Sequence, residues 1–338
     1  MHTKSLCTLG LLILAAGTLP GQTYWSTSPS LDCGGSNAGG AIVQGPLQIT
    51  APTGGTGYVC YVSGTFLWYA AGAGWHTAIR VAAPESGAIR ADYSFVGIAG
   101  NPLSLDLATN GGTTETQSGS EAVFTLNANQ PLEVDLLGRT GAGPGYSNQT
   151  GGSVYAIFEC PDATTCSYVT PQLLFSALPS DPWSLSVPIC WDGLDQDPWS
   201  AVGLNDATHL MSFAIYNADS SPGTYTITVY DSNGNVVGTG TGPSSPLASL
   251  KNGAYGTGGV WAQVLSSAVS TTLPQGMLKV VISASTLSDV MVLQFDGPSA
   301  TTLQVGQDAA PGASSGSSSV GHPKTRRAPT AFTPAPAH

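Results

Sequence analysis

Residues 76–101 read HTAIRVAAPESGAIRADYSFVGIAGN, and this stretch decides the fold. It holds an apolar run, a polar turn around Ser86, a second run in which apolar and polar residues alternate, and the turn Ile98-Ala-Gly-Asn101. Alternation with a period of two places successive side chains on opposite faces of a β-strand. The stretch therefore predicts two strands separated by a polar turn, with a hairpin turn after the second strand.

The same pattern returns after a shift of 134 residues, without a gap. The shift superposes Gly100-Asn101 on Gly234-Asn235, so the second hairpin turn is Ser232-Asn-Gly-Asn235. An internal repeat indicates that one structural module occurs twice. We also expect each copy to end in a hairpin, formed by 154–158 with 173–175 and by 278–282 with 292–295. The apolar positions that superpose are Ile79, Val81, Tyr93 and Phe95 on Phe213, Ile215, Ile227 and Val229.

Strand-length apolar runs bounded by turn-forming residues recur along the whole chain, which is typical of a sandwich or a barrel. Residues 260–270 differ, because their apolar side chains recur at three- and four-residue spacing and so predict a short helix. The predicted fold is all-β: two tandem immunoglobulin-like β-sandwich domains, 22–182 and 183–308, with the boundary near Pro182 and the one short helix in the second. The expected strands include 58–68, 76–83, 91–96, 122–126, 153–158, 209–217, 224–231, 277–283 and 290–295.

Two segments strengthen this interpretation by resemblance. Gly72-Ala-Gly-Trp-His-Thr-Ala-Ile-Arg-Val81, followed by a small-residue turn, an apolar strand and Ala99-Gly-Asn-Pro102, resembles the immunoglobulin-like β-sandwich modules of secreted proteins from soil bacteria. Ser212-Phe-Ala-Ile-Tyr-Asn217 with Tyr230-Asp-Ser-Asn-Gly-Asn235 is similar. The resemblance covers most of residues 60–306. It implies an extracellular structural or adhesive role and no shared chemistry.

The two ends of the chain differ from its body. Lys4, an apolar run from Leu6 through Leu14 and small residues after it form the pattern of a secretory signal peptide, assigned to residues 1–21. We therefore expect a secreted or extracytoplasmic protein without a membrane span. Residues 309–338 are rich in Ser, Pro and Ala, and Phe332 is almost their only large apolar side chain, which predicts a disordered tail. Its cations could contact an anionic polymer of the envelope, although a plain tail accounts for them as well.

Charge excludes one class of partner. Charged residues make up 9% of the chain, against about 25% in average globular proteins. All 20 acidic residues lie between Asp32 and Asp308, with 5 basic residues among them, so this body carries 5 − 20 = −15, and the tail carries +3. An acidic body repels phosphate backbones, so nucleic acid is not expected as a partner.

Five cysteines remain beyond the signal peptide, and an oxidising compartment favours disulfides between them. Cys160 and Cys166 flank a short turn-forming loop and are the first expected pair; Cys33 with Cys60 is the second. Cys190 is then left over, either as a buried thiol or paired between chains.

Neither catalytic nor cofactor-binding residues are predicted. The body holds two histidines, His76 and His209, and the repeat places them in different sandwiches, so a shared hydrolytic site is not expected. Asp192, Asp195 and Asp197 form a weak calcium candidate, because clustered carboxylates suit calcium, but their spacing does not match a calcium loop. No cofactor is otherwise expected.

Aromatic side chains offer the remaining functional signal. Sugars could stack on the aromatic residues of the segment 66–75 or on the tryptophans near the domain boundary. Trp75 in the first group and Trp199 in the second lie beside turns and are the possible glycan contacts. Phe66 and Trp68 fall on one face of a predicted strand and are expected to fill the core instead. The sequence thus favours a non-catalytic secreted protein with a structural, adhesive or matrix-like role, which could contact an extracellular polymer or protein surface. A carbohydrate-binding protein and an extracellular hydrolase are the alternatives.

Overall fold

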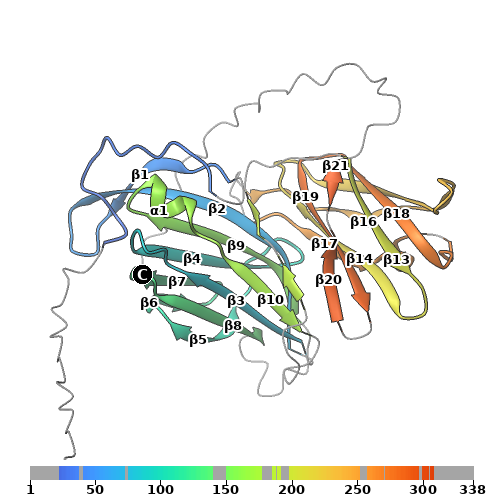
Figure 1. Cartoon of the computed structure of the whole chain (residues 1–338), viewed down its shortest axis with the longest axis horizontal. Helices are drawn as coiled ribbons and strands as arrows, with labels where there is room; N and C mark the ends of the chain where they lie inside the picture. The colour runs from blue at the N-terminus through green and yellow to red at the C-terminus, as the bar shows by residue number, and fades with distance from the viewer. Residues whose placement is uncertain are drawn as a thin grey trace, which may run out of the picture.

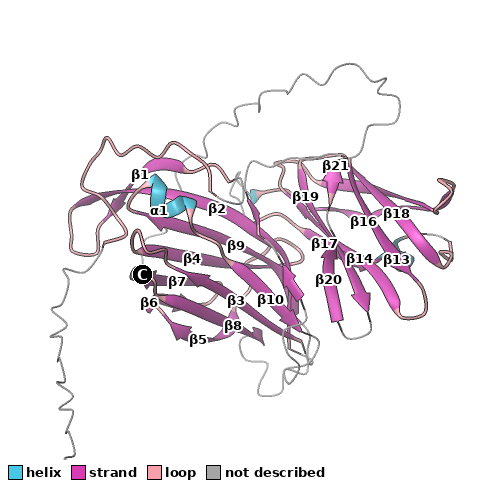
Figure 2. Cartoon of the chain, in the orientation of Figure 1, coloured by secondary structure: helices cyan, strands magenta, loops and turns pink. Residues whose placement is uncertain are grey.

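The computed structural model describes residues 23–37, 41–72, 75–139, 150–176, 185–187, 189–191, 198–251, 257–269, 271–296, 299–303 and 305–307. The predicted signal peptide, Pro182 and the predicted tail lie outside the described residues. Two β-sandwiches stand side by side, and strands account for nearly all of the regular structure (Figures 1 and 2). The predicted all-β fold class is confirmed. Among the described residues, no helix is long and apolar enough to cross a membrane.

The first sandwich contains two antiparallel sheets. The larger has the order β1-β2-β9-β4-β7-β6, with β12 also paired to β2, and the smaller has the order β11-β10-β3-β8-β5. The strands of the larger sheet are β1 (Gln44–Thr50), β2 (Thr56–Ala71), β4 (Ile89–Gly97), β6 (Thr113–Ser118), β7 (Glu121–Leu126), β9 (Thr150–Cys160) and β12 (Cys190–Trp191). Those of the smaller sheet are β3 (His76–Ala82), β5 (Leu105–Gly111), β8 (Pro131–Arg139), β10 (Gln172–Ser176) and β11 (Leu185–Val187).

The second sandwich pairs a five-stranded sheet of order β16-β15-β18-β13-β21 with a four-stranded sheet of order β17-β14-β19-β20. The five strands are β13 (Trp199–Asn205), β15 (Gly223–Tyr230), β16 (Val236–Leu247), β18 (Gly276–Ala284) and β21 (Gly306–Gln307). The four are β14 (His209–Asn217), β17 (Val260–Val264), β19 (Ser288–Asp296) and β20 (Ser299–Leu303). Two helices complete the described elements, α1 (Ala163–Ser167) and α2 (Leu265–Ala268).

The two sandwiches share one topology. Seven strands of the first sandwich pair with one another in the same pattern as seven strands of the second. They are β2, β3, β4, β9, β10, β11 and β12, which correspond in this order to β13, β14, β15, β18, β19, β20 and β21. Strands β7 and β8 take the places of β16 and β17, while β1, β5 and β6 are additional to the first copy. The superposed apolar residues are buried in both copies, from Ile79 and Phe213 to Phe95 and Val229. This shared strand order supports the duplication that the sequence repeat predicts.

The turns are predicted in part. Gly100 and Gly234 have φ of 71° and 81°, which glycine adopts without the steric cost of a Cβ. Residues 231–235 join the paired strands β15 and β16 in a hairpin, whereas the turn at 98–101 leads from β4 into β5 of the opposite sheet. The hairpins expected at the end of each copy are wrong, because β9 and β10, like β18 and β19, belong to different sheets. The two strands of each pair cover opposite sides of a core.

Strands β11 and β12 follow Pro182 but pair with β10 and β2 of the first sandwich. The predicted boundary therefore falls before the last two strands of the first sandwich, and the second begins at β13. Strands of three and two residues are too short for their sequences to show which domain they belong to, so only their pairing partners assign them.

The helix predicted at residues 260–270 is correct only at its centre. Residues 260–264 form β17, which pairs with β14, and helix α2 covers four residues after it. Trp261 packs edge-on against Phe213, with 4.9 Å between the ring centroids. Strand pairing and this packing override the helical spacing, as tertiary context often does. Helix α1, which was not predicted, begins where the Asp162 side chain accepts a hydrogen bond from the Thr165 amide.

Both predicted disulfides form, Cys33–Cys60 and Cys160–Cys166. They tie the N-terminal segment to β2, and the end of β9 to α1. The side chain of Cys190 lies outside the described residues. Disulfides are typical of proteins that fold in an oxidising compartment, which fits an extracellular location.

Removing the first disulfide is expected to cost more stability than removing the second. The bonds close loops with sequence separations of 27 and 6 residues, and the loop-entropy model predicts a difference of about 1 kcal/mol. Urea denaturation of the double variants Cys33→Ala/Cys60→Ala and Cys160→Ala/Cys166→Ala measures it. Equal midpoints and slopes for the two variants would show that loop closure does not set their contributions.

A cluster of charges lies on the outer face of the larger sheet of the first sandwich. Arg90 Nη1 is 3.2 Å from Glu159 Oε1 and 3.9 Å from Asp92 Oδ2, and Arg90 Nε donates to Glu115 Oε2 at 2.9 Å. Glu159 is 7% exposed, and its Oε2 atom has no hydrogen-bond partner among the residues that the structure describes. One guanidinium therefore compensates three carboxylates, two of them largely buried.

Candidate functional site

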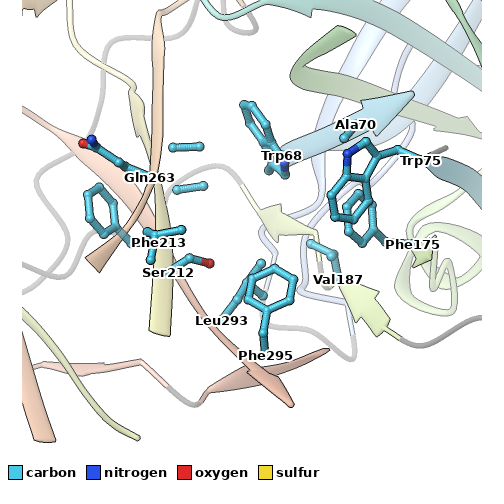
Figure 3. A pocket seen from close by; sticks show the side chains of 13 residues that line it. Trp68, Ala70, Trp75, Phe175, Val187, Ser212, Phe213, Gln263, Leu293 and Phe295 are labelled. Atoms are coloured by element: carbon cyan, nitrogen blue, oxygen red, sulfur yellow. The ribbon is translucent and has the colours of Figure 1, made fainter. Parts of the chain in front are cut away.

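An open groove lies between the two sandwiches, with a volume of about 170 Å³. Figure 3 shows Trp68 and Trp75 on one side of it, and Phe213 and Gln263 on the other. Apolar side chains dominate both walls. The lining residues are Trp68, Ala70, Trp75, Phe175 and Val187 from the first sandwich, and Ser212, Phe213, Ala214, Ala262, Gln263, Val264, Leu293 and Phe295 from the second.

A β-bulge positions Trp68. The register between β2 and β9 shifts between Phe66 and Tyr69, and a bulge changes which face the following side chains occupy. Phe66 is fully buried in the core, whereas Trp68 lies against Gly151, where a Cβ would come within 2.7 Å of the indole. The prediction that Phe66 and Trp68 share one face is therefore wrong, since the bulge separates them and Trp68 lines the groove.

Trp75 enters the groove from the start of β3. Gly72 has φ of 77° and bridges to Trp75, which closes the turn before the strand. The Trp75 ring stacks on Phe175, with centroids 4.8 Å apart and an interplanar angle of 25°. Aromatic stacking adds about 0.5–1.5 kcal/mol to the burial of the two rings. This pair holds the Trp75 ring in a fixed orientation at the groove.

The second wall is the outer face of the four-stranded sheet. Met211, Phe213 and Ile215 of β14 belong to the core of the second sandwich, and the alternating residues Ala214 and Tyr216 pack against the first. On β19, Met291 and Leu293 likewise pack against the first sandwich. An outer face of a sandwich is usually polar, and here it is apolar because the first sandwich covers it.

Polar contacts also join the two sandwiches. The Val260 amide donates to the Ile98 carbonyl at 2.9 Å, and Thr302 Oγ1 donates to the Ser186 carbonyl at 3.0 Å. Lys251 Nζ donates to Asn101 Oδ1 at 2.6 Å. Together with the shared apolar core, these bonds set the spacing of the groove walls.

Two polar side chains, Ser212 and Gln263, occur among the groove residues that the structure describes. Gln263 is already engaged, since its Oε1 accepts from Trp261 Nε1 at 3.1 Å and its Nε2 donates to the Ser267 carbonyl at 3.4 Å. An engineered apolar cavity of about 150 Å³ binds benzene. The groove thus matches a single aromatic ring or apolar side chain in both size and chemistry.

The two predicted glycan contacts have different positions. Trp75 lines the groove, as described above, and is half-buried. Trp199 is only 5% exposed and belongs to the core of the second sandwich, so this possible glycan contact is not accessible to a sugar. On β13 the Trp199 ring points into the core. The proline next to it in the sequence indicates a turn but does not show in which direction the ring points.

The histidines each contact a carboxylate. His76 Nε2 lies 3.2 Å from Asp135 Oδ1, and His209 Nδ1 lies 2.9 Å from Asp206 Oδ1. The Asp206 carboxylate accepts from the Thr208 amide and from His209, and these bonds hold its pKa below the ordinary value.

Thr208 Oγ1 also meets His209 at Nδ1, 3.0 Å away. In a catalytic triad, the two ring nitrogens of the histidine contact different partners. In this protein, Asp206 and Thr208 both contact the same nitrogen of His209, Nδ1. The described groove residues include neither histidine. As the sequence predicts, His76 and His209 lie in different sandwiches.

The calcium candidate Asp192, Asp195 and Asp197 lies outside the described residues, and calcium binding stays a prediction. Among the residues that the structure does describe, no group of three His, Cys, Asp or Glu side chains could hold a metal ion. The sequence does not predict the groove, because its walls belong to two sandwiches whose surfaces meet only in the folded protein. Comparison with protein-family models, with curated proteins and with solved structures finds no match to this chain.

Proposed function

We propose that the protein is a secreted, non-catalytic adhesive or matrix-like protein that recognises an apolar or aromatic group in the groove between its sandwiches. The aromatic-lined groove is the observation that carries the proposal. Binding sites are usually concave, mostly apolar and common at domain interfaces. An adhesive protein needs such a site on a rigid support. Two sandwiches that share a core form a rigid support of this kind.

The rigidity of the groove supports a recognition role. Trp75 is stacked on Phe175, and Trp68 is held against Gly151. Walls that are ordered before binding lose little conformational entropy when a ligand enters. A full aromatic group buried there contributes about 1.5–3 kcal/mol, which suits a contact that acts in multiple copies on a surface.

Filling the groove is expected to weaken the binding of an apolar probe. N-phenyl-1-naphthylamine is neutral and fluoresces in apolar surroundings, so titration reports occupancy. Ala262→Trp places an indole in the groove and is expected to weaken binding at least about tenfold, by occupying the space that the probe needs. Ala108→Trp, at an exposed position of β5, is the matched control and should bind as the wild type does.

The titration also gives a result that would overturn the groove as a site. Equal probe binding by wild type, Ala262→Trp and Ala108→Trp would mean that the probe binds elsewhere. Circular dichroism and the urea midpoint of Ala262→Trp show whether this variant has kept the fold.

Carbohydrate binding is the second candidate, and the position of Trp75 favours it. Its half-buried indole stands at the groove, where a sugar ring could stack. Affinity electrophoresis on common polysaccharides tests this function, with Trp75→Ala as the comparison. Unretarded migration of the wild type would rule it out, and retardation lost in Trp75→Ala would support it.

A further inference from the structure

The lining of the groove suits an apolar occupant, and the chain itself contains a candidate. The described part of the chain ends at Gln307 in β21, and 31 residues follow. We infer that the C-terminal tail is an intramolecular ligand of the groove, with Phe332 as the side chain that enters it. The inference rests on the proposed function, because it uses the same groove.

Composition selects Phe332. Residues 309–338 contain one aromatic residue, Phe332, and one other large apolar residue, Val320. The groove volume of about 170 Å³ suits one aromatic ring. The small residues next to Phe332, Ala331 and Thr333, would let the ring enter without a bulky neighbour at the rim.

The tail is long enough to reach the groove. Strand β21 pairs with β13 in the second sandwich, the same sandwich that supplies β14, β17 and β19 to the groove wall. From Gln307 to Phe332 there are 25 residue steps, which span up to roughly 80 Å when extended. A sandwich of this size has a radius of gyration of about 13 Å. Any surface point of the second sandwich is within reach, and the tether keeps the local concentration of Phe332 high.

The opposite charges of the tail and the body favour this intramolecular contact. The tail carries +3 from Lys324, Arg326 and Arg327, whereas the body between Asp32 and Asp308 carries −15. One carboxylate of that body stands next to the groove along the chain: Asp296 follows Phe295 on β19, and its side chain is 69% exposed. Arg327 precedes Phe332 by five residues, or roughly 17 Å of extended chain, so ring and cation can engage groove and rim together.

The test compares full-length variants by titration with N-phenyl-1-naphthylamine. Phe332→Ala is expected to bind the probe about two- to tenfold more tightly than the wild type, because the competing side chain is removed. Val320→Ala is the matched control and should equal the wild type. The charge variant Lys324→Gln/Arg326→Gln/Arg327→Gln should lie between wild type and Phe332→Ala.

The outcomes separate this inference from the proposed function. If Phe332→Ala binds more tightly and Phe332→Ala/Ala262→Trp loses binding, both stand. Equal binding by wild type and Phe332→Ala, lost in Ala262→Trp, overturns the tail as occupant and leaves the groove as a site for an external group. Binding that Ala262→Trp does not weaken overturns both.

Discussion

Replacing Arg90 with methionine is expected to lower the free energy of unfolding by about 3–5 kcal/mol, the range measured when one partner of a buried ion pair is removed. Arg90 contacts Glu159 at 3.2 Å and Glu115 at 2.9 Å. Methionine keeps much of the apolar stem but leaves Glu159 buried and uncompensated. Urea denaturation at pH 7 measures the loss.

The second-site variant identifies the cause of that loss. Arg90→Met/Glu159→Gln removes the stranded charge together with the cation, so it should recover a large part of the stability. A double variant no more stable than Arg90→Met would show that the guanidinium acts through packing rather than through charge compensation. Arg80→Met is the matched control: Arg80 pairs with Glu133 on the outer face of the other sheet, where its side chain is 46% exposed, and exposed pairs contribute about 0–1 kcal/mol.

Asp92→Asn is expected to act in the opposite direction and to stabilise the protein at neutral pH. Burial first, and then the charge of Glu121, raises the pKa of Asp92 from 3.8 to about 7. The folded state therefore holds a proton that the unfolded chain releases between about pH 4 and pH 7. Stability falls as pH rises through this window, by at most about 4 kcal/mol at about 1.4 kcal/mol for each pKa unit.

The difference between the two pH profiles tests this linkage. Asparagine resembles the protonated carboxyl, so the variant and the wild type should be nearly equal at pH 4, and the variant should be the more stable at pH 8. Burial also raises the pKa of Glu159, against the opposing effect of Arg90, so a smaller slope of the same sign should persist in Asp92→Asn. A constant difference between wild type and variant from pH 4 to pH 8 would contradict the raised pKa. Asp106→Asn, in the other sheet, is the matched control.

Several strands could not be predicted, and particular residues show why. Strand β6 has the sequence TTETQS and lies at the edge of its sheet, where neither face needs apolar side chains. Strand β16, VVGTGTGPSSPL, also lies at an edge and contains Pro243 and three glycines, and glycine and proline normally argue against a strand. The nine predicted strands are confirmed because each alternates or runs apolar against a core.

The period-two pattern, the 134-residue repeat and the two cysteine pairs were enough to determine the fold class, the duplicated module and the disulfides. These features are local in the sequence or recur at a fixed spacing, so each can be recognised without knowing the tertiary structure. The groove was decided by tertiary structure alone. A bulge moves Trp68 out of the core and the first sandwich covers an apolar outer face of the second, because burial depends on which surfaces meet after folding.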